Sequence, residues 1–158
     1  MGEPPDPLLR LMQRLHEEGA QYILVGGQAV RLNGFLRNTE DVDLLLPPSK
    51  ENGRRVIRAL GFLSSSRDLD PAWFEQRGDD PENIRVADDL LIDLLFTANG
   101  ETYDSLQTHV VKTEIDGVPI LTLNIEGLLK TKTAYRDKDR IDREALTRLL
   151  QQLKGEGR

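Results

Sequence analysis

The chain has no cysteine and only two histidines, His16 and His109, among its 158 residues. The absence of cysteine excludes disulfides, thiolate zinc sites and cysteine nucleophiles, and two isolated histidines do not make a histidine-rich metal cluster. Any metal that this protein binds must therefore be held by oxygen ligands.

Long apolar runs are also missing, although 38% of the residues are hydrophobic. No run approaches the roughly 20 residues that span a bilayer, and residues 1–7 lack the basic and then apolar layout of a signal peptide. We therefore expect a cytoplasmic protein without a membrane partner. The length fits one domain over residues 1–158, with the proline-rich residues 1–7 disordered.

The sequence also lacks a net positive charge, since its formal charge is -6. This value argues against a general nucleic-acid coat protein. The charges are unevenly distributed: residues 37–104 hold 8 basic and 15 acidic residues, whereas residues 130–148 hold 7 basic and 4 acidic residues. The acidic part could hold a metal, and the basic part could face a triphosphate or an RNA acceptor, or could be ordinary solvated surface.

Strand and helix patterns alternate through the first part of the chain. Apolar residues at helical spacing predict a helix from Leu8 that ends at Gly19. A strand over 22–25, a Gly26-Gly27 turn and a helix over 28–32 follow, and then a strand over 42–46 and a helix capped by Ser49.

The second half of the chain begins with a polar excursion over residues 64–89, which contains one short helical turn at 72–74. The most apolar segment, 90–96, predicts a central strand. Residues 110–115 and 118–121, joined around Asp116-Gly117, predict a hairpin with a type I′ turn. Helices over 126–136 and 140–153 complete an α/β (α+β) fold, with a small mixed sheet flanked by helices.

Asp41 and Asp43 stand two positions apart at the start of a predicted strand. Because side chains alternate faces, both carboxylates project to one side, about 6 to 7 Å apart along the backbone. Such a pair can hold a magnesium ion together with substrate phosphates. The alternative is a solvated strand entrance with two surface acids.

Asp93 has three apolar residues on each side, in the most apolar segment of the chain. An unpaired charge in a central strand costs several kcal/mol, so its carboxylate needs a compensating partner. One possibility is a buried salt bridge to an arginine, with Arg37 or Arg85 as the candidates. The other is a cluster with Asp41 and Asp43 on a neighbouring strand, which bound cations would make tolerable.

Gly26-Gly27 is a candidate phosphate-binding turn that would complement the metal-binding carboxylates, since glycine lets the backbone approach a ligand closely. A helix that starts near Gln28 would direct unpaired N–H groups toward an anion such as phosphate. A glycine pair after a strand is by itself a weak signal, because tight turns often need one.

Taken together, Val25-Gly26-Gly27, Asp41-Val42-Asp43 and Ile92-Asp93-Leu94 resemble the pattern of the nucleotidyltransferase superfamily typified by DNA polymerase beta. Further residues resemble, more narrowly, the small bacterial AbiEii toxin-type nucleotidyltransferases. They are Arg37, Thr39, a hairpin from Gly117, Lys132 and the run Lys138-Asp139-Arg140-Ile141-Asp142. The resemblance covers roughly residues 8–153.

The resemblance implies a role for each matching residue. Asp41, Asp43 and Asp93 would be the catalytic carboxylates and would bind Mg²⁺ or Mn²⁺, and Asp93 would also help to activate the acceptor hydroxyl. Gly26 and Gly27 would cradle the nucleoside triphosphate, and Lys132 would meet its phosphates unless it is an ordinary surface lysine. Arg37 and Thr39 would position the substrate or stabilise the loop before Asp41.

The implied activity is a magnesium-dependent transfer of a nucleoside monophosphate from an NTP to an acceptor hydroxyl. The acceptor could be tRNA or another RNA, a protein or a small molecule, and the protein could be the toxin of a toxin–antitoxin system with a cognate antitoxin as partner. The alternative is a catalytically silent member of the fold that acts as a binding or antitoxin-type partner module. Loss of a carboxylate would indicate that alternative, and Asp41, Asp43 and Asp93 are all present.

Overall fold

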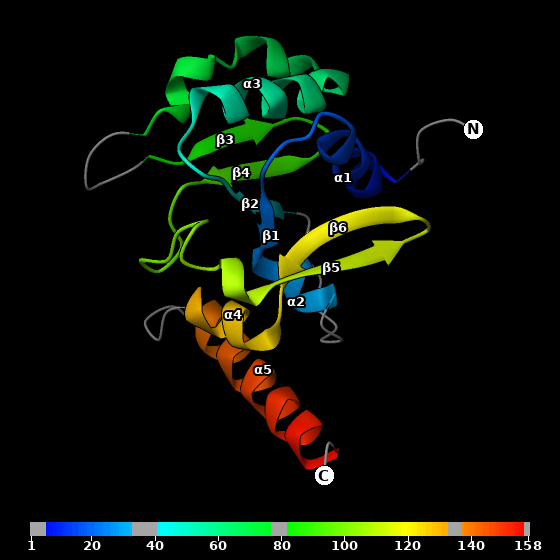
Figure 1. Cartoon of the computed structure of the whole chain (residues 1–158), viewed down its shortest axis with the longest axis vertical. Helices are drawn as coiled ribbons and strands as arrows, with labels where there is room; N and C mark the ends of the chain where they lie inside the picture. The colour runs from blue at the N-terminus through cyan, green and yellow to red at the C-terminus, as the bar shows by residue number, and fades with distance from the viewer. Residues whose placement is uncertain (1–5, 33–40, 77–81, 133–136, 157–158) are drawn as a thin grey trace.

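A computed structural model describes residues 6–32, 41–76, 82–132 and 137–156 of the chain (Figure 1). The prediction that residues 1–7 are disordered is wrong for Asp6 and Pro7. Asp6 accepts a hydrogen bond from the backbone N–H of Leu8, and Pro7 begins the first helix because its missing N–H is not needed there. Residues 1–5 lie outside the described residues. No helix in the described part of the chain is long and apolar enough to cross a membrane.

Three helices belong to the first part of the chain: α1 (Pro7–Glu17), α2 (Gly26–Leu32) and α3 (Lys50–Ala59). Gly19, with a φ of +66°, follows the end of α1, and the side chain of Ser49 caps α3, both as predicted. The prediction for α2 was wrong in one respect. Gly26 and Gly27 form the first turn of this helix and not a separate turn before it.

Six strands form one mixed sheet in the order β3-β4-β2-β1-β6-β5. The strands are β1 (Ile23–Val25), β2 (Asp41–Leu45), β3 (Ile84–Ala87), β4 (Leu91–Leu95), β5 (Val110–Ile115) and β6 (Val118–Leu123). The pairs β2/β4 and β1/β6 are parallel, and the other neighbours are antiparallel. The predicted fold class, a mixed sheet flanked by helices, is confirmed.

Strand β3 was not predicted, because it lies inside the polar excursion. It is only four residues long and buries Val86 between two exposed neighbours. It pairs antiparallel with β4, so β4 is flanked on both sides but is second from the edge of the sheet. The described part of the excursion before β3 contains two short 3-10 turns, η2 (Ser64–Asp68) and η3 (Pro71–Phe74), and η3 confirms the predicted turn. A third 3-10 turn, η1 (Leu60–Phe62), precedes the excursion.

The hairpin of β5 and β6 has the predicted turn. Asp116 and Gly117 have φ values of +52° and +79°, and two successive positive φ angles are the signature of a type I′ turn. This hairpin places β6 next to β1 and carries the chain to the C-terminal helices.

The two C-terminal helices are α4 (Ile125–Lys130) and α5 (Asp137–Glu156). The predicted boundaries were wrong: α4 ends at Lys130 and not near residue 136, and α5 begins at Asp137. In Figure 1, α3 lies beside β3 and β4 at one end of the molecule, whereas α4 and α5 lie at the other end and α5 extends away from the sheet. Helix α4 packs against α2 and α5, and α1 packs against α3 and β6.

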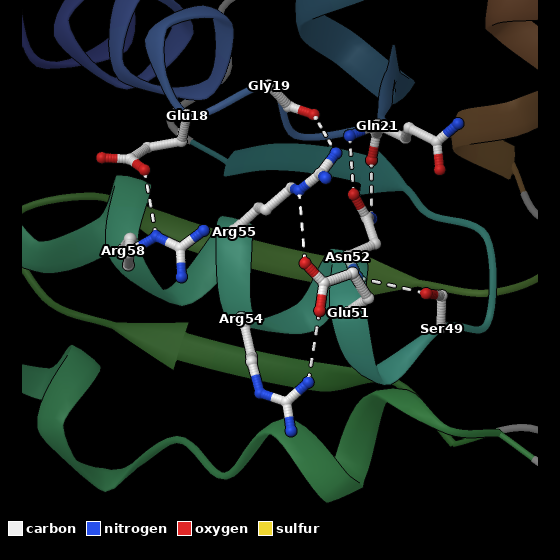
Figure 2. Close-up of polar contacts among 9 residues, drawn as sticks. All are labelled: Glu18, Gly19, Gln21, Ser49, Glu51, Asn52, Arg54, Arg55 and Arg58. Atoms are coloured by element: carbon white, nitrogen blue, oxygen red, sulfur yellow. Dashed lines mark hydrogen bonds and ion pairs between the residues drawn. The ribbon is translucent and has the colours of Figure 1, made fainter.

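Helix α3 also holds the segment that leads into β1 (Figure 2). The buried Asn52 donates to Gln21 O at 2.9 Å and accepts from Gln21 N at 2.7 Å. Arg55 donates to Gly19 O, and Arg58 pairs with Glu18 at 3.0 Å. These contacts fix the entrance of the short strand that ends directly before Gly26.

Candidate functional site

Asp43 and Asp93 lie opposite each other on adjacent strands. Strands β2 and β4 pair in parallel, with Asp43 in register with Asp93. Their carboxyl groups lie close enough for the charge of Asp93 to raise the pKa of Asp43. Since both strands alternate buried apolar residues with these acids, the acids share the face of the sheet opposite to the buried side chains of Val42, Leu44, Ile92 and Leu94.

Burial raises the pKa of Asp43 to about 6, with further contributions from the neighbouring charges of Asp93 and Asp41; the positive charge of Lys132 acts in the opposite direction. Two neighbouring carboxyl groups retain a proton between them more readily than two isolated acids. A divalent cation can take the place of that proton.

Gly26 packs directly against Asp43, because β1 runs antiparallel to β2 and Val25 is in register with Asp43. A Cβ atom at position 26 would overlap Asp43 Oδ2. Gly26 also has a φ of +72°, which L side chains rarely adopt. The glycine is therefore required both by the local backbone and by the neighbouring carboxylate.

Arg85 is the arginine next to Asp93. It lies on β3 in register with Asp93, and its Nε is 3.8 Å from Asp93 Oδ1. The side chains are 57% and 22% exposed, respectively, so this is a partly solvated ion pair and not the buried salt bridge that was considered. Such pairs contribute about 0 to 1 kcal/mol. Asp93 thus has both proposed kinds of partner, an arginine and a second carboxylate.

Asp41 begins β2 on the same face as Asp43 and is half-buried. It acts on Asp43 through its charge. Among the residues that the structure describes, no three Asp, Glu or His side chains gather as a ready cation site. The arrangement brings Asp43 and Asp93 into contact, with Asp41 as a nearby charge.

Lys132 is not on a solvated helix, contrary to expectation. It follows the end of α4, and its Nζ forms an ion pair of 3.0 Å with Asp142 Oδ2 of α5. The two side chains are only 6% and 2% exposed. The alternative of an ordinary surface lysine is therefore excluded. The burial follows from the packing of α5 against α4, which the local sequence does not reveal.

Asp43, Gly26 and Lys132 line one cavity of about 230 Å³. Its remaining walls come from the ends of β1, β4 and α4 and from the residue before β3: Val25, Leu95, Thr97, Ala98, Asn99, Thr131 and Asn83. Sequence reasoning missed the polar residues of this wall. Thr97 and Asn99 could have been found from their position just after the apolar strand, because ligands of α/β sheets often bind beyond the carboxyl ends of the strands.

Among the predicted site residues that the structure describes, Asp41, Asp93 and Gly27 do not line this cavity. Gly27 is the buried second residue of α2 and does not line the wall. Arg37 and Thr39 lie outside the described residues. From the Lys138 to Asp142 run, Asp142 reaches Lys132.

The donor set at Asp43 and Asp93 fits a divalent cation. Both ligands are carboxylates, which hard cations such as Mg²⁺ prefer. They lie side by side in register on adjacent strands, and the charge of Asp93 raises the pKa of Asp43. The two carboxylates are the residues that would hold the ion.

Comparisons with known proteins bear on the fold. No protein-family model and no curated protein matches this chain by sequence. A crystal structure from Thermotoga maritima, described as a "putative nucleotidyltransferase", is similar in structure. The TM-score is 0.56 at 18% sequence identity, over 92% of this chain and 91% of the other. This likeness covers nearly the whole of both chains and shows that the chain has a nucleotidyltransferase-like fold.

Proposed function

We propose that this protein is a nucleotidyltransferase that moves a nucleoside monophosphate from an NTP to an acceptor hydroxyl, with Mg²⁺ or Mn²⁺ as the metal. One observation carries the proposal. Asp43 and Asp93 are in register on parallel strands, and the cavity at Asp43 is also bordered by Lys132. A carboxylate pair beside a lysine suits a metal-bound triphosphate.

Each side chain has a role in this proposal. Asp43 and Asp93 hold the metal, and bound cations would stabilise the attacking and leaving oxygens of an in-line displacement. Asp93, with a side chain 22% exposed, also accepts a hydrogen bond from the acceptor hydroxyl. The ammonium group of Lys132 faces the phosphates as a point charge. Gly26, which lines the same wall, lets the backbone approach the nucleotide.

The resemblance to AbiEii toxin-type enzymes gives the finer part of the proposal. Two separate pieces of that resemblance, Lys132 and Asp142, meet in an ion pair at the cavity, which supports a role for the C-terminal run in the site. The proposed acceptors are tRNA or another RNA, a protein or a small molecule. A toxin role, a cognate antitoxin and a cytoplasmic location are proposed on the sequence alone.

Transfer of labelled nucleotides tests the function. The protein is incubated with each labelled NTP, magnesium and a total RNA pool, and the label is traced to RNA, to protein or to small molecules. We expect one NTP to label one class of acceptor. Asp43→Asn should abolish the transfer, because it removes a ligand charge with almost no change in volume.

Glu126→Gln is the matched control, since it removes the same charge from an exposed residue of α4. We expect it to keep the parent activity. Activity of Asp43→Asn within about tenfold of the parent would contradict the metal assignment. A folded parent that binds an NTP but labels no acceptor would favour the silent binding module instead.

A further inference from the structure

The ion pair between Lys132 and Asp142 joins two parts of the chain that local sequence does not place together. Lys132 follows α4, and Asp142 lies in the second turn of α5. Their charged atoms are 3.0 Å apart, and both side chains are almost completely buried. Removing two charges from water costs several kcal/mol per ion before their attraction compensates, so burial of the pair is not in itself evidence of added stability.

The backbone of Lys132 is also held from outside its own segment. Asn99 Nδ2, in the turn after β4, donates to Lys132 O at 3.1 Å. Arg143 Nη1, the neighbour of Asp142 on α5, donates to the same carbonyl at 3.1 Å and to Leu129 O at 2.7 Å. Helix α5 therefore fixes Lys132 twice, once at the carbonyl and once at the ammonium group.

The position that results is at the wall of the cavity shared with Asp43 and Gly26. A lysine side chain has a flexible four-carbon stem, so its charge is poorly placed unless another group restrains it. The carboxylate of Asp142 is such a restraint, because it contacts the ammonium group and is itself carried by a packed helix.

We propose that Asp142 is a positioning residue that holds the ammonium group of Lys132 at the cavity wall, so that nucleotide binding depends on the carboxylate that α5 presents to this lysine. This inference rests on the nucleotidyltransferase function proposed above. It assigns to α5 a part in the site, although in the described structure Asp142 itself does not line the cavity. Asp142 acts through Lys132 and makes no contact with the nucleotide.

The test compares Asp142→Asn with Leu146→Ala. Leu146 lies one turn further along α5 and is fully buried, so its truncation weakens the same helix without touching the ion pair. Affinity for each NTP with magnesium is measured at 10 °C, well below the melting points, in sucrose to favour the folded state. We expect Asp142→Asn to lose about tenfold or more in NTP affinity, and Leu146→Ala to lose thermal stability but keep the parent affinity.

Asp142→Glu is the second variant. It keeps the charge and moves it by one methylene group, so we expect near-parent stability with an NTP affinity between those of the parent and Asp142→Asn. If Asp142→Asn does not fold, the NTP affinity of Asp142→Glu tests the positioning role of Asp142 by itself. Parent affinity in every Asp142 variant that folds would overturn the proposal, as would an equal loss of affinity in Leu146→Ala.

A second readout needs no nucleotide. An amine-acylating reagent is applied to each folded protein, and the modification of Lys132 is followed by mass spectrometry. We expect slow labelling in the parent and in Leu146→Ala, and faster labelling in the Asp142 variants, because the ammonium group is released from its buried partner. A parent that binds no NTP would refute the proposed function; the labelling would then decide alone, and unchanged labelling in the Asp142 variants would overturn the positioning role.

Discussion

Gly26 shows how tightly single residues are constrained at this site. It combines a φ of +72° with a position at which any Cβ would overlap Asp43 Oδ2. Gly100 has a similar φ of +79°, but no atom lies within 4 Å of its hypothetical Cβ. The two glycines therefore share a positive φ, and of the two only Gly26 also packs against a carboxylate.

We predict that Gly26→Ala lowers the free energy of unfolding by about 2 to 4 kcal/mol, from left-handed strain and a displaced neighbour together. It should also abolish nucleotidyl transfer, because Asp43 must move. Gly100→Ala should cost only the strain, about 1 to 2 kcal/mol, and leave transfer intact. Urea denaturation and the transfer assay measure both effects. Similar losses of stability and activity in the two variants would show that the contact with Asp43 is unimportant.

At the scale of elements, α3 fixes the entrance of β1 through one buried side chain. Asn52 is 3% exposed and both donates to and accepts from the backbone of Gln21 (Figure 2). The ion pairs of Arg54 and Arg55 with Glu51 lie on the exposed side of the same helix. The position of β1, and with it that of Gly26, depends much more on the buried hydrogen bonds of Asn52 than on these exposed ion pairs.

We predict that Asn52→Ala destabilises the protein by about 2 to 4 kcal/mol, because it removes two hydrogen bonds and leaves the N–H and C=O groups of Gln21 without these partners. Arg54→Ala, on the same helix, should change the free energy of unfolding by no more than about 0.5 kcal/mol, since exposed helical pairs contribute little. Urea denaturation of both variants measures the difference. Equal values would mean that α3 is held by its apolar face alone.

At the scale of the whole molecule, the raised pKa of Asp43 makes folding sensitive to pH. The pKa of Asp43 is raised to about 6 in the folded protein from the usual aspartate value of 3.8. The folded protein therefore retains a proton that the unfolded chain has already lost between about pH 4 and 6. The contribution of Asp43 to stability is greatest below about pH 4, falls as the pH rises to about 6, and stays low above it.

We predict that Asp43→Asn raises the free energy of unfolding at pH 7 in chelator by on the order of 2 kcal/mol, so that the variant melts at a higher temperature than the parent. This difference should disappear below about pH 4. Magnesium or manganese should stabilise the parent by roughly 2.7 kcal/mol at a hundredfold excess over Kd, and should not shift Asp43→Asn. Melting curves of the parent and Asp43→Asn, recorded in chelator and with added metal, measure both the effect of the substitution and the shift produced by the metal.

Glu126→Gln is again the control of equal charge, and it should retain the full shift produced by the metal. If the parent melted at the same temperature with and without metal, and Asp43→Asn melted well below it in chelator, the carboxylate pair would be a structural feature and not a cation site.

The sequence by itself determined the features that depend on near neighbours. Alternation places Asp41 and Asp43 on one face of β2, Ser49 caps α3 through its own hydroxyl, and Asp116-Gly117 adopts the two positive φ angles of the tight turn. These features follow from side-chain periodicity and backbone preference over a few residues, so they can be read before the fold is known.

Only the tertiary structure decided which distant residues meet. The pairing of β2 with β4 puts Asp43 beside Asp93, the short strand β3 adds Arg85, and the packing of α5 on α4 buries Lys132 against Asp142. Lys132 illustrates the reason most clearly: its neighbours in sequence are polar enough for a solvated lysine, and its burial arises from a helix that begins after it. The conformational preferences of a few neighbouring residues do not specify such contacts, because the packing of whole helices and strands determines them.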